Sequence, residues 1–147
     1  MIVLGIDPGT EQSGWALFDG KRVINSGVSP NTDMRIMVAL TGADHVAMEA
    51  IASYGMPVGR EVFETCIWIG RFIECASTRP VRLIYRRDVK LHLCGSPKAK
   101  DGNIRQALLD KLGPVGTKKE PGPLYGVKSH TWAALAVAVT AAETPRV

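Results

Sequence analysis

The sequence lacks the features that would assign it to several other classes of protein. Its longest apolar stretch, residues 132–142, is shorter than the roughly 20 residues that cross a bilayer. No basic segment followed by an apolar one stands at the start, so we expect no signal peptide. The cysteines Cys66, Cys75 and Cys94 form no C-x-x-C pair, which favours reduced, buried or inert thiols in a cytosolic protein. His92 and Cys94 alternate without a second ligand pair, so no zinc site is expected.

The composition is typical of a soluble globular domain. Of the 147 residues, 46% are hydrophobic and 22% are charged. This length is enough to bury one hydrophobic core and too short for two ordinary domains. We therefore predict one domain over residues 1–147.

Charge is distributed unevenly along the chain. Residues 1–78 hold five Lys/Arg and nine Asp/Glu, whereas residues 79–119 hold eleven Lys/Arg and three Asp. A basic segment in a folded domain favours a polyanionic partner, and we prefer nucleic acid to the alternative of a solvated basic surface without a partner. The basic block comprises Arg86, Arg87, Lys90, Lys98, Lys100, Arg105, Lys111, Lys118 and Lys119.

Apolar periodicity and turn residues predict an α/β domain with a mixed sheet flanked by helices. Three antiparallel strands come first, and two parallel strands then alternate with helices. We expect Asn31 or Thr32 to cap the first helix, and Val62, Cys66, Ile69 and Ile73 to form the core stripe of the second. The predicted strands are 2–6, 13–18, 22–28, 45–49 and 81–85, the helices are 31–41, 58–75, 87–93, 101–112 and 129–143, and 114–127 is a loop.

Two carboxylates end apolar strands and are the first candidates for a site. Asp7 follows an apolar run and precedes a Pro-Gly turn, and Glu49 ends the run from His45. A carboxylate inside a sheet is costly unless a cation or a hydrogen-bond donor satisfies it. If the two strands are neighbours, the carboxylates converge, which favours a metal site. The alternatives are a turn-capping Asp7 and a solvent-reaching Glu49.

These residues resemble the RuvC-type Holliday junction resolvases of the ribonuclease H fold. The resemblance rests on Gly5-Ile6-Asp7-Pro8-Gly9-Thr10 with Ser13-Gly14-Trp15, on Met48-Glu49, on Val89-Lys90 followed by Gly95, and on the run 130–138. The order of elements fits that fold along nearly the whole chain. The short length is more similar to a phage-encoded member, which implies the cytoplasm of a bacterium or of a phage-infected cell.

The resemblance implies a set of metal ligands. Asp7 and Glu49 match the family pattern, and His130 falls where the family has Asp or sometimes His. The last ligand position falls on Ala133, which cannot bind a metal. Asp101 is our candidate for the missing carboxylate, and the alternative is that Asp101 only caps the helix that begins there.

The resemblance also implies the chemistry: hydrolysis of a phosphodiester in a branched DNA, with one nick per subunit of a homodimer. Two Mg²⁺ ions are expected, with Mn²⁺ as a substitute because His130 is a softer ligand than Mg²⁺ prefers. We expect the basic block, Lys111 excepted, to bind phosphates, and Tyr54 and Met56 to contact unpaired bases or else to cover the core edge. Phe63, Trp68 and Phe72 are expected to offer a dimer contact unless both helix faces are buried in the monomer.

Two other function classes stay open. Asp-x-Gly-Thr followed by Ser-Gly also resembles the first phosphate loop of the actin and sugar-kinase superfamily, which binds ATP between two such domains. Ala133 is also compatible with a branched-DNA-binding module that has lost catalysis. ATP binding and a metal-dependent nicking assay would discriminate between these classes.

Overall fold

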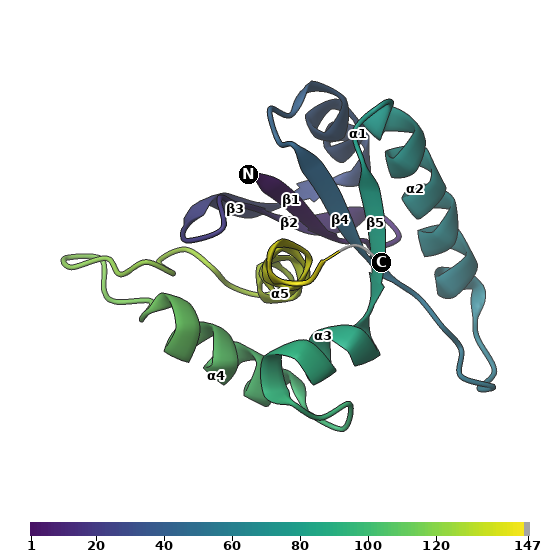
Figure 1. Ribbon diagram of the computed structural model, residues 1–147. Coiled ribbons are helices and arrows are strands. Elements are labelled where there is room, and N and C mark those ends of the chain that lie inside the picture. The colour runs from purple at the N-terminus through teal and green to yellow at the C-terminus, as the bar shows by residue number, and fades with distance from the viewer. Residues whose placement is uncertain (146–147) are drawn as a thin grey trace.

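The computed structural model describes residues 1–145 as five strands and five helices around one sheet (Figure 1). Every element follows the predicted order, with ends shifted by up to two residues. The strands are β1 (Val3–Asp7), β2 (Gln12–Phe18), β3 (Val23–Pro30), β4 (His45–Ala50) and β5 (Val81–Tyr85). The helices are α1 (Asn31–Leu40), α2 (Arg60–Ala76), α3 (Arg86–Cys94), α4 (Asp101–Leu112) and α5 (Thr131–Glu143).

The sheet confirms the predicted mixture of antiparallel and parallel strands. Its order is β3-β2-β1-β4-β5, so β1 is the central strand. Strands β1, β2 and β3 pair antiparallel, while β4 pairs parallel to β1 and β5 pairs parallel to β4. Because β1 and β4 are parallel neighbours, Ile6 pairs with Met48, and the next residues, Asp7 and Glu49, lie at the same end of the sheet.

The helices form a layer on each face of the sheet (Figure 1). Alternation along β1 sends Val3 into a core cluster with α5, and sends Leu4 and Ile6 into a second cluster with α1 and α2. Helices α3 and α4 cover α5 on the side away from the sheet. Asp7 shares the face of Val3 and therefore points toward α5.

Helix α5 packs unusually close to the central strand. A Cβ added at Gly5 would lie 2.2 Å from the Ala134 carbonyl oxygen and 2.7 Å from the Ala138 Cβ. Residues 134–140 of α5 are all buried, as the apolar composition of this helix predicts. The small residues of β1 and α5 therefore fix the distance between the helix and the strand that carries Asp7.

Helix α2 faces the core with a different stripe from the predicted one. Its buried residues are Thr65, Ile69, Phe72 and Ala76, so only Ile69 of the predicted stripe is buried. Phe72 belongs to the core and is not free for a partner, and Trp68 is half-buried against it. The helix carries apolar residues almost all round, so periodicity alone did not fix which side faces the sheet.

Two further sequence predictions are corrected. The first residue of α1, Asn31, is buried and its side chain makes no capping hydrogen bond. All three cysteines are free, but Cys66 is exposed rather than buried. Within residues 1–145, no helix is both long and apolar enough to cross a membrane.

Candidate active site

Asp7 and Glu49 are neighbouring carboxylates at the ends of adjacent parallel strands. Their side chains are only 20% and 14% exposed. Burial raises the pKa of Asp7, although His130 opposes this shift. Burial also raises the pKa of Glu49, and the charge of Asp7 raises it further. The pair is thus two like charges largely removed from water, an arrangement that a bound cation would stabilise.

His130 reaches Asp7 from the start of α5. Its Nδ1 lies 3.3 Å from the Asp7 Oδ2, and its side chain is 63% exposed. The backbone of His130 passes directly over β2, because a Cβ at Gly14 would lie 2.6 Å from the His130 carbonyl oxygen. The structure therefore brings three of the predicted site residues close together: Asp7, Glu49 and His130.

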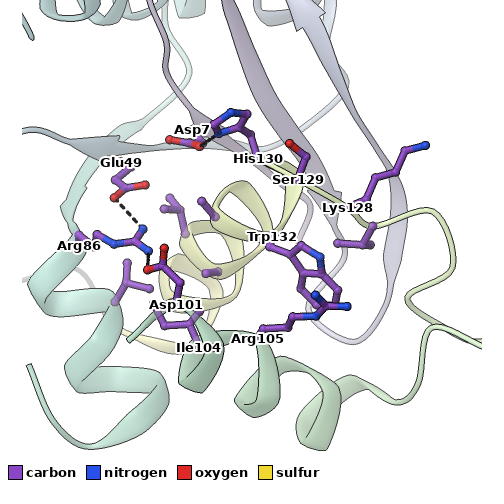
Figure 2. A pocket seen from close by; sticks show the side chains of 16 residues that line it. Asp7, Glu49, Arg86, Asp101, Ile104, Arg105, Lys128, Ser129, His130 and Trp132 are labelled. Atoms are coloured by element: carbon purple, nitrogen blue, oxygen red, sulfur yellow. Dashed lines mark hydrogen bonds and ion pairs between the residues drawn. The ribbon is translucent and has the colours of Figure 1, made fainter. Parts of the chain in front are cut away.

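Arg86 connects Glu49 with Asp101 (Figure 2). The Arg86 Nη1 donates to the Glu49 Oε1 at 3.2 Å, and the Nη2 pairs with the Asp101 Oδ1. Asp101 is the first residue of α4, its side chain is 82% exposed, and its carboxylate pairs with Arg86 and does not cap the helix. The observed partner of its carboxylate is a guanidinium. The cap is instead formed from Asn103, whose Oδ1 accepts from the Lys100 backbone N–H at 2.9 Å.

A buried polar network holds the turn that follows Asp7. The Ser13 hydroxyl donates to the Asn31 Oδ1 at 2.6 Å, and the Asn31 Nδ2 donates to the Gly9 carbonyl at 2.9 Å. The Gly9 N–H donates in turn to the Ser13 Oγ at 3.3 Å. Local sequence did not indicate this role of Asn31, because its partners lie 18 and 22 residues away along the chain.

A cavity of about 560 Å³ opens beside these acids, between α5 and the helices α3 and α4. The polar and aromatic lining residues that sequence reasoning missed are Trp132, Lys128 and Ser129. The lining residues that were predicted are Asp7, Glu49, Arg86, Asp101, Arg105 and His130. The Arg105 guanidinium lies over the Trp132 ring, 4.8 Å from its centroid. An aromatic residue beside a predicted ligand was the available signal for Trp132. Ala133 also lines the cavity, one turn beyond His130.

The basic block is spread over α3, α4 and the segments that follow each helix. Only Arg86 and Arg105 of the block line the cavity. The exposed members outside it are Arg87, Lys98, Lys100, Lys111, Lys118 and Lys119, and Lys90 is half-buried. Tyr54 and Met56 are 65% and 70% exposed, so they do not cover the core edge. The predicted contacts of these residues with DNA stay predictions.

The donor chemistry of the cavity fits a hard divalent cation. The cavity holds three carboxylates, and carboxylate oxygens are the ligands that Mg²⁺ prefers. Their charge is balanced by Arg86, Arg105 and Lys128, which line the same cavity. Among residues 1–145, however, no three His, Cys, Asp or Glu side chains are grouped so that they could hold an ion by themselves. Water or phosphate oxygens would therefore have to complete the coordination of an ion at Asp7 and Glu49.

Comparison with known proteins identifies the fold. No protein-family model matches the sequence, and no curated protein matches it. Among solved structures, Thermus thermophilus RuvC has a TM-score of 0.73 and 23% identity, over 95% of this chain and 92% of that one. T. thermophilus RuvC in complex with a Holliday junction substrate has a TM-score of 0.72 at the same identity and coverage. The chain therefore has the ribonuclease H-like fold of RuvC, as the sequence predicted.

Proposed function

We propose that this protein is a metal-dependent endodeoxyribonuclease that resolves four-way or other branched DNA junctions. One observation carries the proposal. Two mostly buried carboxylates, Asp7 and Glu49, lie at the ends of adjacent parallel strands, at a cavity lined by arginines and on a fold similar to that of RuvC. The neighbour that holds a Holliday junction supports branched DNA as the substrate class.

The chemistry uses the residues that line the cavity. Asp7 and Glu49 would hold Mg²⁺, or Mn²⁺ in its place, and the bound ion would activate water and stabilise the charge that develops on the leaving 3′ oxygen. His130, hydrogen-bonded to Asp7, is placed to orient a water molecule or to accept its proton. Lys128 and Arg105 on the cavity wall supply positive charge to phosphates.

We further propose that the protein acts as a homodimer through α2. A four-way junction has two symmetric scissile strands, so a two-fold dimer would carry one site for each. The exposed side of α2 forms an apolar stripe at helical spacing, away from the sheet. This α2 stripe comprises Phe63, Cys66, Ile67, Gly70 and Ile73.

The proposal is tested by cleavage of labelled DNAs of matched sequence. We expect nicks in a four-way junction with Mg²⁺ or Mn²⁺, and none in the linear duplex or with EDTA. Asp7→Asn should bind the junction without cutting it. Junction binding without cleavage under every metal condition would favour the catalytically impaired module, for which Ala133 is the supporting observation. Absence of junction binding would exclude both.

A further inference from the structure

The Arg86 guanidinium is held between two acids that were both candidate metal ligands (Figure 2). It contacts Glu49 through one nitrogen and Asp101 through the other. Arg86 is the first residue of α3 and directly follows β5, whose Ile84 pairs with Glu49. The strand register therefore places the Arg86 guanidinium, which is always charged, beside Glu49.

The opposite wall of the cavity offers no further carboxylate. Helix α5 presents His130 and then, one turn later, the methyl group of Ala133. The acids that line the cavity are Asp7, Glu49 and Asp101, and two of these three already share Arg86. A second divalent ion would have to displace Arg86 or depend on Asp7, His130 and water alone.

We propose that Arg86 takes the place of a second metal ion, so that the site holds one divalent ion, bound by Asp7 and Glu49. Asp101 is then a positioning residue that holds Arg86, and not a metal ligand. The guanidinium has five N–H donors, so its two carboxylate contacts leave donors for an oxygen of the scissile phosphate. This inference rests on the proposed nuclease function and replaces the two ions that the family resemblance implies.

The test counts Mn²⁺ ions bound to the full chain without DNA, by the electron paramagnetic resonance signal of free Mn²⁺. We expect one ion per chain for the wild type and for Arg87→Ala, a matched control that removes the neighbouring exposed arginine. Arg86→Ala and the near-isosteric Arg86→Gln should each bind two. Adding Asp101→Asn to either Arg86 variant should return the count to one, because Asp101 would then be the added ligand. Unfolding temperatures identify a variant that fails to fold. If one Arg86 variant does not fold, the ion count of the other Arg86 variant is used.

The outcomes separate this inference from the proposed function. Two ions in the wild type, or one ion in a folded Arg86 variant, would overturn the inference and leave the nuclease proposal in place. No ion in the wild type would overturn the inference, and the nuclease proposal would then be decided by the junction-cleavage assay alone. The expected counts without cleavage of any junction would support the inference and overturn only the nuclease function. The Mn²⁺ dependence of cleavage is a second readout: first order for the wild type and second order for Arg86→Ala.

Discussion

At the scale of single residues, Asp7 is a buried acid whose burial acts against folding. Because its pKa is raised in the folded protein, the neutral form is favoured there. Its contribution to stability is therefore greatest below the pKa of the unfolded chain, and is lost as the pH rises through the higher folded value. Above that folded value and without a metal, the charged side chain destabilises the fold.

The first prediction follows from the direction in which the Asp7 pKa is shifted. Asp7→Asn should lower cleavage by about three orders of magnitude or more, as loss of a principal electrostatic group does. It should also raise the melting temperature in EDTA at pH 7, and the difference should shrink as the pH falls toward 4. Circular dichroism melts across this range measure the effect. Adding Mn²⁺ should stabilise the wild type and not the variant; a variant that is less stable than the wild type at pH 7 would contradict the assignment.

Arg86 shows how a residue can have more than one predicted role. Its position in a basic block favoured phosphate binding, whereas the structure adds ion pairs with Glu49 and Asp101. These partners lie 37 and 15 residues away along the chain. The two roles are compatible, because a fixed guanidinium beside the acids also faces the cavity where a phosphate would bind.

At the scale of elements, the site depends on how closely α5 lies on the sheet. His130 precedes α5 and Asp7 ends β1, so a shift of the helix would separate the two side chains. Gly5 and Gly14 each leave space for a backbone carbonyl of this segment. Both glycines belong to the motifs that carried the family resemblance, and their role here is steric.

The second prediction concerns this packing. Gly5→Ala should destabilise the protein by about 3 kcal/mol, because its Cβ would meet the backbone of α5, which cannot rotate away. Gly102→Ala is the control: nothing lies within 4 Å of its Cβ, and alanine in a helix gains about 0.5–1 kcal/mol over glycine. Urea unfolding measures both. Equal stabilities for the two variants would mean that α5 lies farther from β1.

At the scale of the whole molecule, one face of the sheet is predicted to bind DNA and the opposite face to form the dimer contact. Helices α3 and α4 lie on one side of the sheet and α2 lies on the other (Figure 1). The basic block belongs to α3, α4 and the segments that follow them. A dimer through α2 would thus leave both cavities uncovered. This arrangement gives two predictions, one for each face.

For the face that carries α2, Ile67→Glu should shift the protein from dimer to monomer. Ile67 is 55% exposed near the middle of the stripe, and a charge there would be desolvated in the dimer. Leu91→Glu is a matched control, since Leu91 is 52% exposed on α3. Analytical ultracentrifugation measures both states. A wild type that is monomeric at high concentration, or an Ile67→Glu variant that stays dimeric, would exclude α2 as the contact.

For the basic face, Lys98→Ala with Lys100→Ala should weaken junction binding and reduce its salt dependence. Each phosphate contact that is lost should lower the slope of log K against log salt by about 0.9. Lys21→Ala with Arg22→Ala, in the exposed hairpin between β2 and β3, should leave the slope unchanged. If the two double variants gave the same slope, the turn between α3 and α4 would not face DNA.

The sequence by itself determined the order of the elements and the mixed sheet, and it placed Asp7 and Glu49 at strand ends that meet if the two strands are neighbours. These features follow from local patterns: apolar runs give strands, and parallel neighbouring strands end at the same edge of the sheet. His130 was located by the resemblance to the RuvC-type family, in which its position carries a metal ligand. The strand and helix assignments needed only residues that are close along the chain, whereas the neighbouring of β1 and β4 was established by the structure.

Only the tertiary structure decided which side of α2 is buried, what Asn31 binds, and where Arg86 lies. Helix α2 has apolar residues on two sides, and the side that packs against the sheet and α1 is the one that contains Phe72, not Cys66. Asn31 and Arg86 bind partners that are brought near by folding from 15 to 37 residues away. Local sequence does not predict such contacts, because their energies depend on burial and on distances that exist only after the chain has folded.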